Sequence, residues 1–149
     1  MLKAVTDKFP ALKGYVISNP ADIFYLTDFY CVDALVLYSE DTVLITDSRY
    51  TVAAKSASVR SNISSNGYIN GIIEEARAQG ITELGIQEDH LTASDYIALT
   101  EAGFKLVRTG GIFTAIRASK TDSEIEKIQK AQDITDKAFT EILPYIKAG

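Results

Sequence analysis

The clearest hydrophobic pattern in the chain is a pair of short apolar runs, Leu35–Tyr38 and Val43–Thr46, separated by the polar triplet Ser39-Glu40-Asp41. Continuous apolar runs bounded by turn residues are typical of strands that are buried on both faces. We therefore predict a hairpin in the middle of a sheet, with helices covering both faces of that sheet.

Elsewhere the pattern alternates short apolar strands with amphipathic helices. Strands are predicted at 15–18, 59–63, 84–86 and 104–107, and helices at 2–9, 51–58, 68–79 and 92–102. Asn19 is expected to cap a further helical turn that begins at Pro20. Gly80 and Gly103 follow helices in the usual C-terminal position, and Gly110-Gly111 marks a turn. This alternation predicts an α/β fold, and the hairpin makes its sheet mixed rather than purely parallel.

The last part of the chain has a different character. Residues 121–124, Thr-Asp-Ser-Glu, form a capping-box sequence, and an apolar stripe then continues from Ile125 to Ile142. The helix is expected to cover about 22 residues, or about 33 Å, which is long for so small a domain. Because such a stripe needs cover, we expect a truncated piece of a longer protein. In isolation, another copy or the chain's own sheet should cover the stripe.

Composition narrows the functional classes. The 149-residue chain carries 15 basic and 20 acidic residues, and its net charge of −5 argues against a broad nucleic-acid surface. The polar N-terminus and the lack of a long apolar run predict neither a signal peptide nor a membrane span, so we expect no membrane partner. The single Cys31 excludes an internal disulfide and fits a reducing cytoplasm.

Several chemistries have little support in the residues. The only histidine, His90, excludes a metal site built on several histidines, and is expected at the surface before a helix. A Ser-His-Asp triad is arithmetically possible, but no G-x-S-x-G sequence accompanies it. Gly110-Gly111 lacks the surrounding pattern of a phosphate-binding loop. No basic neighbour in the sequence lowers the pKa of the Cys31 thiol, so we expect a buried, inert cysteine.

Four stretches taken together resemble one family. They read NPADIFYLTDF at 19–29, DSRY at 47–50, GIQE at 85–88 with Leu91 and Thr92, and RASKT at 117–121 with Glu124, Ile125 and Ala131. In this order they are similar to the N-terminal, creatinase-type domain of the metallopeptidases that include Xaa-Pro dipeptidases (prolidases) and Xaa-Pro aminopeptidases. The resemblance covers essentially the whole chain.

The resemblance implies a mixed α/β domain of ribonuclease H-like topology over residues 1–116. Residues 117–149 would then be a linker and the first helix of a pita-bread catalytic domain. The parent protein would hydrolyse peptide bonds preceding proline, with two divalent metal ions (manganese, cobalt or zinc) held by two Asp, one His and two Glu. All five ligand positions lie beyond this chain, so the fragment itself is expected to bind no metal and to be inactive.

The resemblance also implies partners and candidate site residues. The partners are the chain's own catalytic domain, a second subunit in a homodimer, and a proline-containing peptide. Asp47, Arg49 and Tyr50 leave a buried strand at its C-terminal end and are candidates for shaping a substrate cleft or a dimer contact. Alternatively, the turn only caps a helix, Arg49 pairs with a nearby carboxylate, and Tyr50 packs on the sheet.

The loop at 28–33 supplies the remaining candidates. The resemblance suggests that it reaches toward a partner subunit, so that Asp28, Phe29, Tyr30 and Asp33 bound the substrate pocket. The alternative is a well-packed connector, because aromatic residues more often belong to a core than to a contact. Asp28 departs from the family, which commonly has glycine there. If that position has a positive φ, aspartate is one of the few tolerable replacements.

Two other functions stay open at this stage. Peptidase-like domains of this family also occur in proteins that bind partners without cleaving them. A stand-alone enzyme that uses a serine or Cys31 is the other alternative. Metal ligands beyond residue 149 would identify a metallopeptidase, and metal-free turnover by the chain would identify the stand-alone enzyme.

Overall fold

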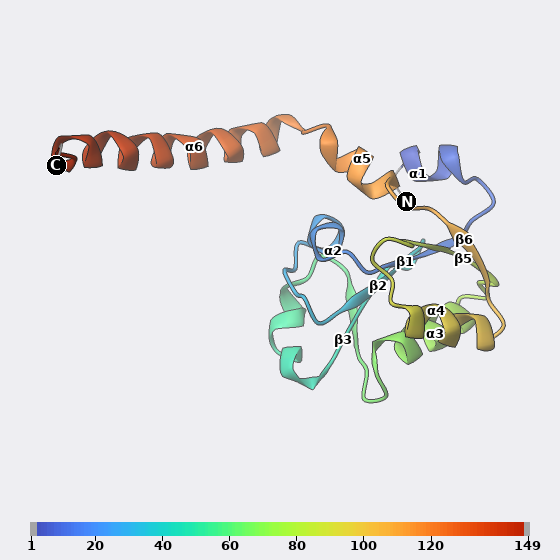
Figure 1. Cartoon of the computed structure of the whole chain (residues 1–149). Coiled ribbons are helices and arrows are strands. Elements are labelled where there is room, and N and C mark those ends of the chain that lie inside the picture. The colour runs from blue at the N-terminus through green and yellow to red at the C-terminus, as the bar shows by residue number, and fades with distance from the viewer. Residues whose placement is uncertain (1–2, 148–149) are drawn as a thin grey trace. The chain divides into compact units, whose positions relative to one another are not determined.

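The computed structural model describes residues 3–147 and divides the chain into two compact units, Met1–Ile116 and Arg117–Gly149. Six strands lie in the first unit: β1 (Gly14–Ile17), β2 (Leu35–Tyr38), β3 (Val43–Thr46), β4 (Arg60–Ile63), β5 (Glu83–Ile86) and β6 (Lys105–Arg108). Its α-helices are α1 (Lys3–Lys8), α2 (Pro20–Thr27), α3 (Tyr68–Ala78) and α4 (Ala93–Glu101), and its 3₁₀ helices are η1 (Ser48–Tyr50) and η2 (Ala53–Ser56). Helix α5 (Ile112–Ala118) spans the boundary between the units (Figure 1).

The strands form one mixed sheet in the order β4-β3-β2-β1-β5-β6. Strand β2 pairs antiparallel with both β1 and β3, and the other three pairings are parallel. In the register of the hairpin, Leu35 lies opposite Ile45 and Leu37 opposite Val43. Every residue of β2 and β3 is buried, so the predicted central hairpin and mixed sheet are confirmed.

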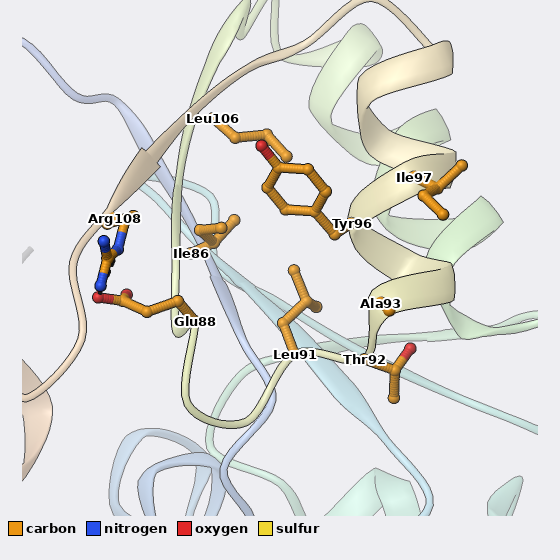
Figure 2. Close-up of a pocket in the computed structure, with 9 residues that line it drawn as sticks. All are labelled: Ile86, Glu88, Leu91, Thr92, Ala93, Tyr96, Ile97, Leu106 and Arg108. Carbon is orange, nitrogen blue, oxygen red and sulfur yellow. Dashed lines mark hydrogen bonds and ion pairs between the residues drawn. The ribbon is translucent and has the colours of Figure 1, made fainter.

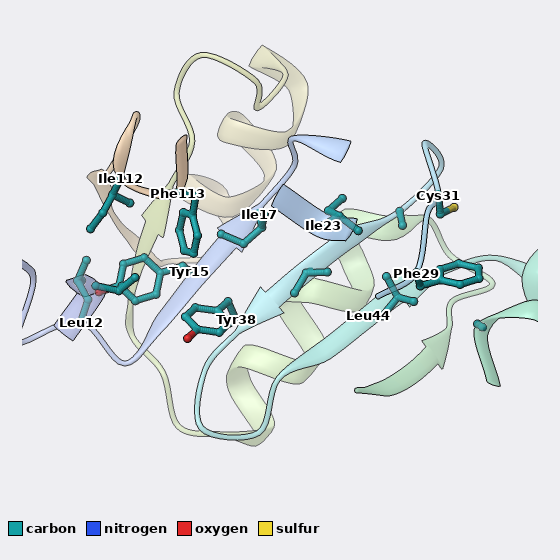
Figure 3. Close-up of a cluster of buried hydrophobic side chains, with 14 residues drawn as sticks. Leu12, Tyr15, Ile17, Ile23, Phe29, Cys31, Tyr38, Leu44, Ile112 and Phe113 are labelled. Atoms are coloured by element: carbon teal, nitrogen blue, oxygen red, sulfur yellow. The ribbon is translucent and has the colours of Figure 1, made fainter. Parts of the chain in front are cut away.

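Alternate side chains of the strands separate the core into two layers. Helices α3 and α4 pack on one face of the sheet, against side chains such as Val16 and Leu37. Helices α1, α2 and α5 contribute to the cluster on the other face (Figures 1 and 3). Three rings anchor that cluster: Phe113 lies edge-on to Tyr15 and Tyr38, with centroid distances of 6.2 and 5.7 Å. Helices therefore cover both faces, as the hydrophobic runs predict.

Local capping follows the sequence closely. Asn19 accepts a hydrogen bond from the Ala21 N–H at 2.9 Å, and Pro20 occupies the first turn of α2, where its missing donor costs nothing. Gly80 follows α3 with a φ of +66°, and Gly103 follows α4 with a φ of +90°. Both glycines adopt the left-handed backbone that ends a helix at low cost.

The structure corrects three details of the secondary-structure prediction. Helix α5 was not predicted, because its seven residues are too few to show a helical period. The segment 51–58, predicted as a helix, holds only the short 3₁₀ helix η2. In α4, Leu99 is fully buried, whereas Tyr96 and Ile97 are about half exposed, so only part of the predicted apolar face reaches the core.

The second unit consists of the end of α5, the helix α6 (Asp122–Ile142) and the 3₁₀ helix η3 (Leu143–Tyr145). The predicted capping box is present: Glu124 N–H donates to the Thr121 hydroxyl, and the Glu124 carboxylate accepts from the Thr121 N–H. Among the described residues of this unit, up to residue 147, the apolar stripe of α6 has no cover, and no residue of α6 is buried. None of the helices within residues 3–147 is long and apolar enough to cross a membrane.

Candidate functional site

The turn that leaves β3 is held by an aspartate–arginine fork. Asp47 has extended backbone and caps η1, because its Oδ1 accepts from the Arg49 N–H at 2.9 Å. The Arg49 side chain folds back on the same carboxylate, with Nε 3.0 Å from Oδ1 and Nη2 2.7 Å from Oδ2. Charge-assisted pairs of this geometry are the stronger kind of hydrogen bond. The cap and the ion pair considered for this turn are thus both present.

Two side chains from other elements join the fork. The Tyr68 hydroxyl, at the start of α3, donates to Asp47 Oδ2 at 2.5 Å and accepts from Arg49 Nη2 at 3.1 Å. Asp33, in the loop before β2, places Oδ2 3.3 Å from Arg49 Nη2. Sequence reasoning singled out Asp33 but missed Tyr68, since no local pattern marks a helix residue as the partner of a turn 21 residues earlier.

Three groups of this cluster, Asp47, Arg49 and Tyr68, have pKa values that are shifted further away from neutral pH. Hydrogen bonds from Arg49 and then Tyr68 hold the pKa of Asp47 well below its usual value. The bond to Asp47 likewise raises the pKa of Arg49, and burial followed by the Asp47 bond raises that of Tyr68. A general acid or base needs a pKa near the working pH. The fork can therefore hold a fixed geometry and charge, but it is unsuited to moving protons.

An aromatic pair extends the cluster toward the core. Phe29 is buried and meets the Tyr50 ring edge-on, with 6.1 Å between centroids. The Arg49 guanidinium lies 5.7 Å from the Tyr50 ring, and the Tyr50 hydroxyl donates weakly to Asp33 Oδ2 at 3.5 Å. A hydrogen bond with Cys31 is the largest cause of a raised Tyr50 pKa. The predicted residues Phe29, Asp33, Arg49 and Tyr50, with the capping aspartate, thus lie in one cluster.

The structure places the other two candidates at the end of α2 instead. Asp28 has a φ of +53°, and its N–H donates to the Phe24 carbonyl at 2.9 Å to close the helix. Aspartate is therefore present in a left-handed conformation, as expected for a residue that replaces glycine. Tyr30 is 71% exposed and stacks edge-on with Phe24 at 6.3 Å. The loop hence combines one packed aromatic, Phe29, with one that faces solvent.

Two of the hollows on the surface of the first unit lie beside residues discussed above or among the family-like stretches. One, of about 460 Å³, borders the fork and is lined by Asp47, Ser48, Arg49, Ile63, Ser64 and Ser65. The other, of about 600 Å³, lies among β5, β6 and α4 (Figure 2) and is lined by Ile86, Glu88, Leu91, Thr92, Ala93, Tyr96, Ile97, Leu106 and Arg108. Both volumes fall within the range of small-molecule sites. The sequence did not predict the hollow beside α4. Tyr96 and Ile97, two apolar residues of α4 that lie off its buried face, were the signal that could have indicated it.

Two of the four family-like stretches meet at a buried glutamine. Gln87 Oε1 accepts from the N–H groups of Ser18 and Asn19 at 2.8 and 2.9 Å. Its Nε2 donates to Asp22 Oδ2 at 2.5 Å, and both side chains are almost fully buried. The loop beyond β5 therefore holds the start of α2. His90, nearby, places Nε2 2.8 Å from Asn19 Nδ2, which is a surface contact beside the same junction.

The described residues do not fit a metal centre. Within residues 3–147, no three His, Cys, Asp or Glu side chains are grouped so that they could hold an ion. The two carboxylates of the candidate cluster, Asp33 and Asp47, are both engaged by the Arg49 guanidinium. No catalytic step that needs a metal can therefore be assigned to these residues.

Residues 6–119 match the family model for the creatinase/prolidase N-terminal domain. The chain belongs to this family. A Bacillus anthracis Xaa-Pro dipeptidase structure is 31% identical, with a TM-score of 0.87, and the match covers 99% of this chain and 43% of that one. A Thermotoga maritima X-Pro aminopeptidase structure is 26% identical, with a TM-score of 0.85, covering 97% and 44%. YqhT, an uncharacterized Bacillus subtilis peptidase, is 28% identical, covering 93% of this chain and 40% of its own length.

The coverage of these relatives shows that the chain corresponds to their N-terminal part. The chain spans about two fifths of the length of these relatives and carries the N-terminal domain of the family. The fold inferred from the sequence resemblance, a mixed α/β domain followed by a long helix, is confirmed.

Proposed function

We propose that this chain is the non-catalytic N-terminal domain of a cytoplasmic Xaa-Pro dipeptidase or aminopeptidase. The observation that carries the proposal is the match over 97–99% of this chain to solved Xaa-Pro peptidases more than twice its length. In the whole protein, a catalytic domain following this chain would bind two divalent metal ions and cleave peptides at proline, and α6 would be its first helix.

We further propose that the Asp47–Arg49 fork and the loop at 28–33 form part of the substrate-cleft wall or a dimer contact. Support comes from the position of the cluster at the C-terminal end of β3 and from the hollow beside it. The fork supplies a fixed charge arrangement held by Asp33 and Tyr68, which suits orientation of a peptide. The exposed Tyr30 supplies the apolar contact that an interface needs.

The first test is the downstream reading frame, expressed as the whole protein. We expect five metal ligands, two Asp, one His and two Glu, and metal-dependent hydrolysis of an Xaa-Pro dipeptide or of a longer peptide with proline in second position. The 149-residue chain assayed alone should show no turnover. A frame without those ligands would instead favour the alternative of a peptidase-like binding module, and metal-free turnover by the chain alone would refute the proposal.

The second test asks whether the fork contributes to the cleft. In the whole protein, Arg49→Met is expected to raise KM for the peptide about tenfold, with a smaller change in kcat, because a contact that positions the peptide is lost. Arg60→Met is the matched control, since Arg60, on β4, pairs with Asp41 in the β2–β3 turn and with Glu75 on α3, away from the fork. Equal effects of both variants would show that the fork only stabilises the fold.

The dimer contact has its own measurement. Tyr30→Asp places a charge on an exposed ring position and should weaken dimerisation of the whole protein in sedimentation experiments, while the thermal midpoint of the isolated chain stays unchanged. If dimerisation were unchanged, the loop at 28–33 would not belong to the dimer interface. The proposed role in the substrate cleft would then depend on the KM measurement alone.

A further inference from the structure

Strand β6 is an open edge of the sheet in the first unit. It stands last in the strand order, and no other described strand pairs with its outer side. The N–H groups of Lys105 and Thr109 donate to carbonyl groups in and just before β5, at 3.0 and 2.9 Å. Alternate residues of a strand direct their backbone groups to opposite sides, so those of Leu106 and Arg108 point away from β5. The N–H and C=O groups of these two residues are therefore available to a further strand.

The hollow beside α4 lies along this open edge. Its lining includes Leu106 and Arg108 of β6 and Tyr96 and Ile97 of α4, so the edge strand and the helix form its two sides (Figure 2). Leu106 packs against the core cluster on the α4 face, whereas Val107 packs against the cluster on the other face. The two residues whose backbone groups point outward thus have their side chains at the hollow. A strand added to β6 would place every second side chain there.

The middle of the hollow is apolar. Ile86 and Leu91 line it with aliphatic atoms, and the Tyr96 ring reaches toward Leu106 (Figure 2). Tyr96 and Ile97 are 48% and 53% exposed, so much of their apolar surface is in contact with water. Removing such surface from water is favourable. With a volume of about 600 Å³, the hollow has room for a side chain as large as leucine.

A charged pair bounds one end of the hollow. Glu88 Oε1 accepts from Arg108 Nε at 3.1 Å, and Glu88 Oε2 accepts from the Gly110 N–H at 2.8 Å. Nη1 and Nη2 of Arg108 make no hydrogen bond with any residue that the structure describes. A guanidinium binds a carboxylate through two parallel N–H groups. This end of the hollow therefore favours an acidic group on a ligand.

We propose that the hollow between β6 and α4 binds an extended peptide, which pairs with β6 as a further strand of the sheet. An apolar side chain of the peptide fills the hollow beside Leu106, and an acidic side chain two positions away binds Arg108. Antiparallel pairing is the more stable direction per residue, and it places the acidic residue two positions before the apolar one. The site lies at the opposite end of the strand order from β3 and its fork, so it does not depend on the proposed function.

Fluorescence anisotropy with the labelled probe Thr-Thr-Glu-Thr-Leu-Thr-Thr, which contains no proline, tests the site on the 149-residue chain and on the whole protein. We expect saturable binding with a dissociation constant below about 1 mM. Arg108→Gln should raise that constant about tenfold, because the contact with the glutamate of the probe is lost. Lys105→Gln is the matched control: Lys105 lies on the same strand but pairs with Glu83, and its side chain points to the other face, so the constant should change less than about twofold.

N-methylated probes test the pairing of the two backbones. Methylation of the glutamate and leucine nitrogens removes the two N–H groups that face β6, and should weaken binding by at least about 30-fold. Methylation of the threonine nitrogen between them, which points away from β6, is the matched control and should weaken it less than about threefold.

Three outcomes would overturn the proposal. The chain would not bind the probe, or the two kinds of N-methylated probe would lose binding equally, which would mean that no strand forms. Alternatively, the chain would bind the probe and the whole protein would not, which would show that another part of the protein covers β6. A dimer of the chain that the probe dissociates in sedimentation experiments would likewise assign the edge to a second copy.

Discussion

The buried side chain of Gln87 gives the sharpest prediction for stability. Gln87→Met keeps the length of the side chain but removes one donor and one acceptor. The Asp22 carboxylate then loses its hydrogen bond from Nε2, and the N–H groups of Ser18 and Asn19 lose their shared acceptor. Methionine adapts to irregular space, so a clash or a cavity should add little.

The expected cost follows from these three contacts. A hydrogen bond to a charged group contributes about 1.5–3 kcal/mol and one between neutral groups about 1 kcal/mol, with less than full additivity. We therefore expect Gln87→Met to lower the free energy of unfolding by about 3 kcal/mol. For a domain of this size, that loss corresponds to a thermal midpoint lower by roughly 10–20 °C.

Urea unfolding at pH 7, followed by far-ultraviolet circular dichroism, measures this loss. Gln129→Met is the matched control, because Gln129 is exposed on α6 and makes one hydrogen bond, to Asp133 at 2.7 Å. The control should cost no more than about 0.5 kcal/mol. If Gln87→Met lost less than about 1 kcal/mol, or no more than the control, the junction would not hold the two stretches together as argued.

Three further predictions concern the first unit. The hydrogen bond from Arg60 lowers the pKa of Glu75, whose folded pKa therefore lies below its unfolded value. The resulting stability is present above the unfolded pKa and lost as pH falls through the folded pKa, so Glu75→Gln should cost about 1 kcal/mol at pH 7 and progressively less as the pH of the urea titrations is lowered. Gly85→Ala would drive Cβ into the Tyr15 ring at Cδ1, and a thermal melt should show a loss of about 1–3 kcal/mol; an unchanged midpoint would mean that the ring moves aside without cost. Asp28→Gly should exceed Asp28→Ala in stability by about 1 kcal/mol, because only glycine adopts its positive φ without strain, and equal melts would contradict that.

Local physics made much of the fold predictable. The paired apolar runs at 35–38 and 43–46 form the central strands β2 and β3. A strand whose residues are all apolar is stable only when both of its faces are buried. Asn19-Pro20 began α2, and Thr121 with Glu124 began α6, since capping depends on side chains within three residues of the helix start. Short elements without a period, such as α5, gave no such signal.

The candidate site shows where local reasoning stops. The role of Asp47 as a cap was readable from its neighbours, but its bond with Tyr68 joins a strand end to a distant helix start. The same holds for Gln87, whose partners lie 65 to 69 residues earlier in the chain. No sequence pattern predicts the Asp47–Tyr68 bond or the bonds of Gln87, because both depend on the order in which the strands pair in the sheet.

The amino-acid sequence by itself determined most of the elements, the membership of the strands in a mixed sheet, and the apolar stripe along α6, because each depends on spacing between near neighbours. Only the tertiary structure decided which charged and polar groups share a site. It brought Asp33, Arg49 and Tyr68 together and left Asp28 and Tyr30 at the end of α2. The physical reason is that sheet order, β4-β3-β2-β1-β5-β6, is settled by the packing of whole faces rather than by any local preference.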